Sequence, residues 1–150
     1  MIMKKTMLLF ITISFFGIVQ SQETTNITFN HIALSVKNLD ESATFYKEVL
    51  GLQEITNKTK IEGIRWFSFG EGKELHLISI LKDPVVINKA VHFALSTTNF
   101  NSFVKTLQDR YITYSDWPGI INKITMRADG ILQVYFQDPN GYWIEVNSVN

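Results

Sequence analysis

The chain has 150 residues, with 14 basic and 14 acidic side chains and a formal net charge of 0. It contains no cysteine, so a disulfide framework, a thiol nucleophile and a cysteine-linked lipid anchor are all excluded. No basic stripe runs along the sequence, which argues against nucleic acid and anionic membrane surfaces as partners. The composition is that of a globular protein of one domain.

Residues 1–21 have the pattern of a secretory signal. Two lysines precede the apolar stretch MLLFITISFFGIV, which is shorter than the ~20 residues that span a bilayer. We therefore expect cleavage near Ser21/Gln22, export to the periplasm or the medium, and no stable membrane anchor. The mature chain, 22–150, would form a single domain with a net charge of about −2, because two lysines are lost and no acid. An N-terminal core helix is the alternative.

The first half of the domain, about 29–81, predicts a strand, a helix and three further strands. HIALSV, at 31–36, alternates between apolar and small or polar residues, as a half-buried strand does. A helix is expected over 41–50, with Asp40 as its N-cap and Gly51 just past its end. The following strands are LQEITN, IRWFSF and ELHLISI.

The second half, about 90–149, follows a linker at 82–89 and repeats this order. HFALST predicts the strand, and Asn99 or Asn101 can cap the helix SFVKTLQDRY. Turn signals in the sequences ADG and DPNG then separate three strands, KITMR, ILQVYF and YWIEVNS.

The two halves are copies of one unit. When His31 is placed over His92, an offset of 61, five of eight positions are identical. The predicted fold is therefore α+β: two βαβββ modules in tandem form a curved eight-stranded mixed sheet. One helix would cover each half from outside, which leaves a concave pocket on the opposite face.

Strand alternation places the candidate site residues in this pocket. All three histidines, His31, His76 and His92, point away from the helices, and so do Trp143 and Glu145. A carboxylate inside a pocket is costly unless it is paired or bound to a metal. Imidazole and carboxylate together suit one divalent ion of Zn, Ni, Co, Mn or Fe. We therefore predict a metal site of the three histidines and Glu145, although each residue alone could be a hydrogen-bonded structural group.

Further residues are candidates for substrate contact. Trp66 shares the inward face of its strand if its apolar neighbours are core, and Trp143 precedes Glu145 by two positions. The Pro/Gly-containing segment 115–123, with Trp117, could cover the pocket mouth or pack down. Three cations are candidate clamps for an anionic substrate: Arg65, Lys123 and Arg127.

Three segments resemble the vicinal oxygen chelate superfamily, which includes glyoxalase I, bleomycin-binding proteins and extradiol dioxygenases. NHIALSVKNLDESATFYKEVLGL resembles its opening strand and helix, VHFALSTTNF its second-module opening, and FQDPNGYWIEV its closing hairpin. The similarity covers 29–148. It implies His31, His92 and Glu145 as metal ligands, and His76 stands where glyoxalase I has a second glutamate.

The resemblance implies a glyoxalase-like enzyme of the isomerase or lyase type. It would hold a small oxygen-chelating substrate and stabilise an enediolate-like anion while Glu145 moves a proton. His76 weakens an assignment to lactoylglutathione lyase, because one of the two carboxylate bases is missing. The alternatives are an Fe-dependent, extradiol-type dioxygenase and a non-catalytic small-molecule binding or resistance protein. A homodimer is compatible with the resemblance, with the ligands drawn from one chain or from two.

Overall fold

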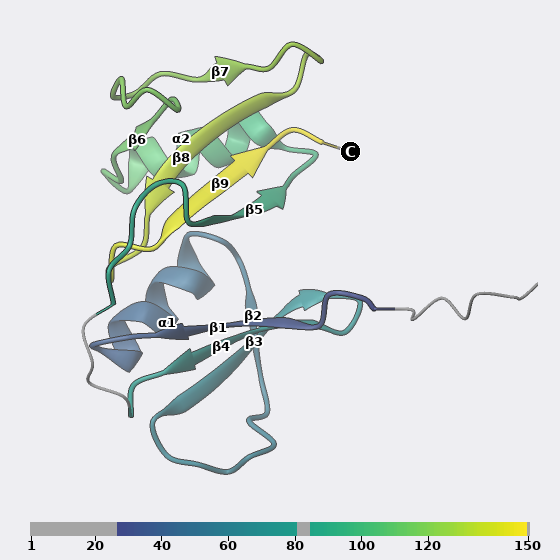
Figure 1. Cartoon of the computed structure of the whole chain (residues 1–150), viewed down its shortest axis with the longest axis vertical. Helices are drawn as coiled ribbons and strands as arrows, with labels where there is room; N and C mark the ends of the chain where they lie inside the picture. Colours follow the sequence, from purple (N-terminus) through teal and green to yellow (C-terminus); the bar gives the residue numbers. More distant parts are fainter. Residues whose placement is uncertain (1–26, 81–84, 150) are drawn as a thin grey trace, which may run out of the picture.

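The computed structural model describes residues 27–80 and 85–149 (Figure 1). The predicted secretory segment, 1–21, lies outside the described residues. The α+β class and the repeated strand–helix–strands order are confirmed. Among the described residues, no helix is both long enough and apolar enough to cross a membrane.

The first module forms a mixed sheet with the strand order β1-β4-β3-β2. Strand β1 runs parallel to β4, and the other neighbours are antiparallel. Its elements, in chain order, are β1 (His31–Ser35), α1 (Leu39–Glu48), β2 (Gln53–Ile55), β3 (Ile64–Gly70) and β4 (Lys73–Ile78).

The second module forms a sheet with the order β5-β9-β8-β6, in which β7 also pairs with β8. Its elements are β5 (His92–Ser96), α2 (Phe100–Asp109), β6 (Tyr114–Ser115), β7 (Thr125–Met126), β8 (Leu132–Gln137) and β9 (Trp143–Asn147). Because β9 takes one edge of β8, the short strands β6 and β7 share the other edge. The segment between them, 116–124, leaves that edge as a loop.

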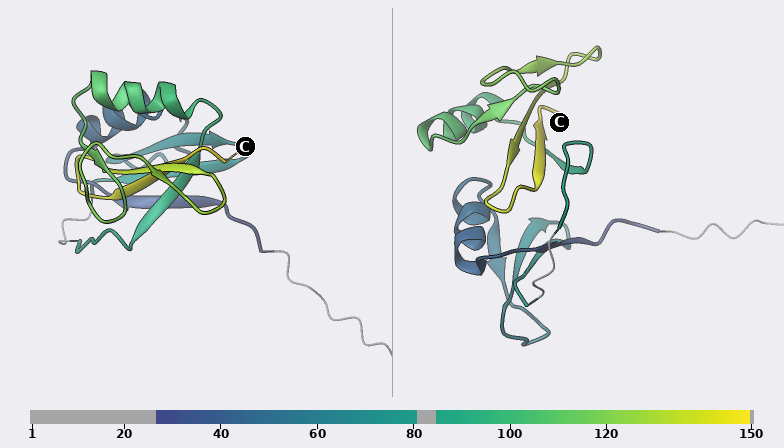
Figure 2. Two further views of the ribbon diagram at one scale, coloured as in Figure 1. Left: turned by 90° about the horizontal axis from the view of Figure 1, so that it is seen from above. Right: turned by 60° about the vertical axis from the view of Figure 1, so that its left-hand side comes forward.

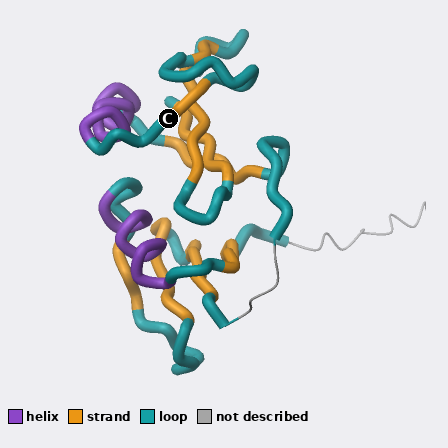
Figure 3. Tube along the Cα trace, turned by 90° about the vertical axis from the view of Figure 1, so that its left-hand side faces the viewer, coloured by secondary structure: helices purple, strands orange, loops and turns teal. Residues whose placement is uncertain are grey.

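The structure has two hydrogen-bonded sheets of four and five strands where the sequence predicted one sheet of eight. The extra strand arises because β6 and β7 divide one edge position between them. Strands β1 and β5 are each an edge strand of their sheet. Each pairs with one neighbour of its own module, β4 or β9, and the two sheets are not joined through them. Helices α1 and α2 lie on the same side of the sheets, as expected (Figures 2 and 3).

The beginning of α1 differs from the prediction. Asn38, and not Asp40, is the N-cap, and its side chain accepts hydrogen bonds from the backbone N–H groups of Asp40 and Glu41, each at 3.1 Å. Asp40 lies in the first turn, where a negative charge is favourable, and pairs with Arg65 at 2.9 Å. Gly51 follows the helix with φ +67°, a left-handed conformation that suits glycine.

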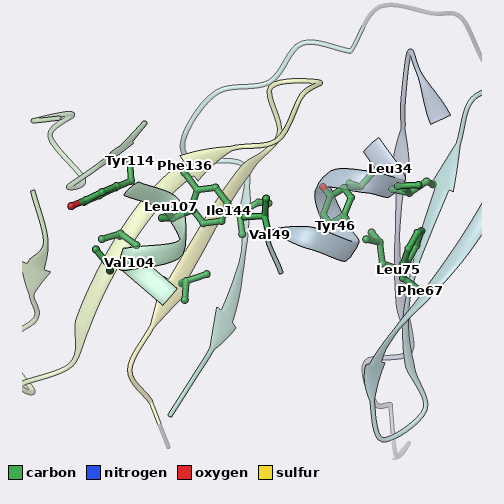
Figure 4. Close-up of a cluster of buried hydrophobic side chains, with 14 of the residues drawn as sticks. Leu34, Tyr46, Val49, Phe67, Leu75, Val104, Leu107, Tyr114, Phe136 and Ile144 are labelled. Atoms are coloured by element: carbon green, nitrogen blue, oxygen red, sulfur yellow. The ribbon is translucent and has the colours of Figure 1, made fainter. Parts of the chain in front are cut away.

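The hydrophobic core confirms the predicted alternation of the strands. Most residues expected beneath the helices are buried: Leu34, Val36, Leu75, Leu77, Ile144 and Val146. Three others expected there, Ile32, Phe93 and Leu95, are half-buried and pack against the edge of this core. Figure 4 shows this cluster continuing through α1, where Tyr46 and Val49 lie between the two sheets. One apolar core therefore links both modules, and the opposite faces of the sheets carry the candidate site.

A turn of the second module, 138–141, docks against the first module. The buried carboxylate of Asp138 accepts a hydrogen bond of 2.9 Å from the hydroxyl of Tyr46 in α1. The side-chain amide of Asn140 donates to the hydroxyl of Ser42 at 2.8 Å. These bonds fix the orientation of the modules, since each breaks if the turn moves away from α1.

The Tyr46 hydroxyl makes the fold sensitive to high pH. Burial, followed by the nearby charge of Asp138, raises the pKa of Tyr46 above its usual 10.0. The protonated Tyr46 hydroxyl therefore contributes fully to stability below pH ~10, where tyrosine in the unfolded chain is also protonated. This contribution is lost as the pH rises further. In Tyr46→Phe we expect the fall in unfolding free energy above pH 10 to be shallower by up to ~1.4 kcal/mol per pH unit.

Urea denaturation between pH 7 and pH 11 measures this slope. Tyr111→Phe is the matched control, because that side chain is 94% exposed and its variant should titrate like the wild type. Equal slopes for wild type and Tyr46→Phe would contradict the assignment.

Candidate metal centre

The face of the first sheet that points away from the helices carries a stack of three rings. The ring of Trp66 in β3 lies against that of His76 in β4, with centroids 4.1 Å apart and planes at 8°. His76 in turn stacks on His31 in β1 at 4.4 Å and 17°. The structure thus brings together three side chains that the sequence predicted to face the pocket.

Hydrogen bonds fix the two imidazoles differently. Nδ1 of His31 bonds the side-chain oxygen of Asn30 at 2.7 Å, which leaves Nε2 for a ligand. Nε2 of His76 instead bonds the carboxylate of Glu74 at 2.8 Å. Glu74 therefore places a carboxylate two positions before His76 on the same strand face.

The second sheet holds the other pair. Nε2 of His92 in β5 is 3.5 Å from Oε2 of Glu145 in β9, and Nδ1 of His92 bonds the backbone oxygen of Lys89 at 3.0 Å. Glu145 is buried and accepts hydrogen bonds from the hydroxyl of Tyr135 at 2.6 Å and from the amide of Asn147 at 3.0 Å. Each oxygen of the carboxylate thus has one hydrogen-bond donor from the protein.

Strand register shows that the two pairs are equivalent positions of the repeat. His76 lies opposite Ala33 of β1, and Glu145 lies opposite Ala94 of β5. On the other side, Trp66 pairs with His76 as Tyr135 pairs with Glu145. Each module therefore presents an imidazole on its first strand, a second donor on its last strand and an aromatic ring beside that donor.

The sequence reasoning did not single out Tyr135. Its alternation with the buried Val134 and Phe136 would have placed it on the pocket face. Burial, followed by its hydrogen bond to Glu145, raises the pKa of the Tyr135 hydroxyl above its usual 10.0. At neutral pH the hydroxyl therefore keeps its proton and donates a hydrogen bond to the carboxylate.

The two pairs lie on separate sheets of the chain. Within residues 27–80 and 85–149, no three His, Cys, Asp or Glu side chains are grouped closely enough to hold a metal ion. The donor chemistry nevertheless fits a divalent metal, because a hydrogen bond on Nδ1 of His31 and of His92 leaves Nε2 of each ring for a ligand, and that of His92 lies 3.5 Å from the carboxylate of Glu145. Each module thus carries one pair of the predicted donors.

The predicted anion clamps are neutralised by the chain's own acids. Arg127 pairs with Asp129 at 2.7 Å, and Arg65 pairs with both Asp40 and Glu54. Lys123 likewise pairs with the buried carboxylate of Asp116 at 3.0 Å. Trp143, the other predicted substrate contact, is half-buried with its ring centroid 4.8 Å from the ammonium of Lys89, a residue that the sequence did not single out.

Comparison with known proteins agrees with this architecture. Residues 28–146 match the family model described as the Glyoxalase/Bleomycin resistance protein/Dioxygenase superfamily. "Glyoxylase I 4" of Arabidopsis thaliana is 25% identical over 123 residues, covering 78% of this chain and 68% of that protein. Among solved structures, a glyoxalase/dioxygenase from Nostoc punctiforme has a TM-score of 0.65 at 25% identity, covering 82% of this chain and 91% of its own. Oxidase ChaP-H2 shares the fold, with a TM-score of 0.69 at 20% identity and coverage of 84% and 96%.

Proposed function

The chain belongs to the glyoxalase/bleomycin resistance protein/dioxygenase superfamily, and from that premise we propose that it is a metal-dependent enzyme of the isomerase or lyase type. Its substrate would be a small molecule that offers adjacent oxygen atoms. The observation that carries the proposal is the pair of matching half-sites, in which His31 and His92 each have Nδ1 held by a hydrogen bond. Such outer bonds orient an imidazole and raise its basicity as a ligand.

His31, His92 and Glu145 would hold the metal, with His76 as the fourth candidate. A divalent ion there, Zn, Ni, Co, Mn or Fe, would supply Lewis acidity toward a substrate carbonyl. Glu145 is oriented by Tyr135 and is suited to take or return a proton. Position 76 carries histidine where glyoxalase I has its second glutamate. Glu74 would supply a carboxylate in place of that glutamate, because it is hydrogen-bonded to the imidazole of His76.

We further propose that a second copy of the chain completes each site. The turn at 138–141, through the buried Asp138 and through Asn140, holds the modules of one chain in place, so the half-sites do not meet by a simple swing of one module. Strands β1 and β5 each end a sheet, and a groove of about 620 Å³ opens beside them. Its lining includes apolar side chains of both modules: Phe29, Ile32, Phe69, Phe93 and Leu95. A second copy would cover this surface and bring the first module of one chain to the second module of the other.

Metal content of the purified chain tests the proposal. We expect about one divalent ion per chain in the wild type after reconstitution, and a loss of affinity in His92→Ala larger than the ~10- to 100-fold typical of outer-shell changes. Lys105→Ala is the control, because that lysine pairs with Asp109 on the exposed surface of α2. Inductively coupled plasma mass spectrometry and a competition titration with a chelating dye give the two quantities.

If the wild type holds no stoichiometric metal, or if His92→Ala binds metal as tightly as the wild type does, the proposed centre is wrong. A metal-free chain that still binds small molecules would support the non-catalytic binding protein instead.

One observation favours a second candidate, an iron-dependent dioxygenase. Glu74 occupies Nε2 of His76, which leaves His31, His92 and Glu145 as a two-histidine, one-carboxylate set. Iron oxygenases use such a set because it keeps positions open for substrate and O₂. Oxygen uptake that requires Fe²⁺ would support this candidate. Exchange of a carbon-bound substrate proton with D₂O, without oxygen uptake, would support the isomerase or lyase.

A further inference from the structure

The ammonium group of Lys89 lies among three aromatic rings on the site face of the second module. Its nitrogen is 4.7 Å from the ring centroid of Tyr135, 4.8 Å from that of Trp143 and 5.8 Å from that of Trp117. All three distances are within the range of favourable cation–π attraction. Tyr135 and Trp143 belong to the sheet, whereas Trp117 belongs to the loop that leaves its edge.

The same ammonium group donates hydrogen bonds to the last residue of β6 and to the first two residues of that loop. Its acceptors are the hydroxyl of Ser115 at 3.0 Å, the backbone oxygen of Trp117 at 3.1 Å and the backbone oxygen of Asp116. A lysine ammonium has three N–H donors, so these three acceptors use all of them. Lys89 thus joins the segment before β5 to the loop between β6 and β7.

One residue of this loop, Trp117, lies beside the His92–Glu145 pair. The ring of Trp117 meets that of His92 edge-on, with centroids 6.0 Å apart, and that of Tyr135 at 5.5 Å. Tyr135 is the donor that holds Glu145. The position of Trp117 therefore decides how open the approach to both donors is.

The loop has little apolar burial of its own to hold it. Trp117, Ile120 and Ile121 are 48%, 52% and 64% exposed. The carboxylate of Asp116 does accept N–H bonds from Gly119 and Ile120, but these bonds lie within the loop and do not attach it to the sheet. A bridge between Ser115 and Ile121 joins the far end of the loop to β6, with a bond of 2.8 Å from the N–H of Asn122 to the backbone oxygen of Tyr114. The part of the loop that carries Trp117 is attached to the segment before β5 by the side chain of Lys89.

We propose that Lys89 is a positioning residue, which holds the loop 116–124 closed over the His92–Glu145 half of the site. Its backbone oxygen fixes Nδ1 of His92, and its ammonium fixes the segment that carries Trp117. Lys89 thereby fixes both the orientation of the His92 ring and the position of the loop beside it. The role of His92 and Glu145 as metal ligands rests on the proposed function, whereas the attachment of the loop by Lys89 does not.

Hydrogen–deuterium exchange of the full-length chain, read by mass spectrometry, tests the inference. Lys89→Met keeps the length of the side chain and removes the charge and the donors, so we expect backbone exchange over 116–124 to rise about tenfold or more. Peptides from β8 and β9 should exchange as in the wild type. Lys89→Arg retains a cation with several donors and should keep exchange within about threefold of the wild-type rate.

Lys105→Met is the matched control, because it removes an exposed ammonium from α2 and should leave the loop unchanged. Unchanged exchange over 116–124 in Lys89→Met overturns the inference, and so does a rise spread evenly over the whole chain. An arginine variant as open as the methionine variant overturns the role of the cation. Metal content is measured in the same samples: loop opening confirms the inference with or without bound metal, whereas missing metal counts against the proposed function alone.

Discussion

Two variants that each lack one half-site are expected to regain metal binding when they are mixed. The first variant carries His31→Ala and His76→Ala, and the second carries His92→Ala and Glu145→Gln. Alone, each should bind metal far more weakly than the wild type, because every site then lacks two donors. In a mixed dimer, one site combines the intact second module of the first variant with the intact first module of the second. An equal mixture should therefore hold about 0.25 strong sites per chain if the copies exchange freely.

The control mixture combines the first variant, which carries His31→Ala and His76→Ala, with the single variant His31→Ala. Both lesions lie in the first module, so every site formed between two chains keeps one defective half and no strong site should appear. Subunit exchange can be assisted by joint unfolding and refolding, and light scattering reports whether dimers form. The experiment therefore separates a site shared between chains from a general effect of mixing.

Two outcomes would contradict the shared site. If the mixture binds no more metal than the two variants measured separately, the half-sites of different chains do not combine. If each of the four single substitutions lowers metal affinity in a chain that remains monomeric, the site closes within one chain.

Much of the fold could be predicted because the sequence repeats itself and its strands alternate. The offset of 61 residues between His31 and His92 identifies two modules, and apolar residues at every second position identify their buried faces. Alternation also predicts that Trp66 and His76 face the pocket side of the first module and that His92 and Glu145 face that of the second, and the structure brings each pair into contact. These features depend on local periodicity, which is visible in a single sequence.

The rest depends on contacts between residues that are distant in sequence. Nothing in the sequence indicates that Arg65 pairs with Asp40, or that Lys89 reaches across to the loop of Trp117. The bond between Glu74 and His76 depends on rotamers, and two donors two positions apart on a strand need not touch. The placement of the half-sites follows from how the modules dock, which the repeat alone leaves open.

The docking turn leads to the second large expected effect, in Asp138→Ala. The buried carboxylate of Asp138 accepts hydrogen bonds from the hydroxyl of Tyr46 and from the backbone N–H groups of Asn140 and Tyr142. Removing the acceptor leaves buried donors without a partner, and a hydrogen bond to a charged group contributes about 1.5–3 kcal/mol. Because these losses are partly relieved by relaxation and water, we expect the free energy of unfolding to fall by about 3–5 kcal/mol.

Urea denaturation at pH 7 measures this change, with Asp109→Ala as the control. Asp109 is an exposed acid of α2 paired with Lys105, so its removal should alter stability by no more than ~0.5 kcal/mol. In a double-mutant cycle, Tyr46→Phe should cost markedly less in the Asp138→Ala background than in the wild type, because the two groups share one bond across the module boundary. A loss below ~1 kcal/mol in Asp138→Ala, or strict additivity in the cycle, would mean that this turn does not hold the modules together. The case for completing the site with a second chain would then lose its structural reason, since the two halves of one chain would be free to close on each other.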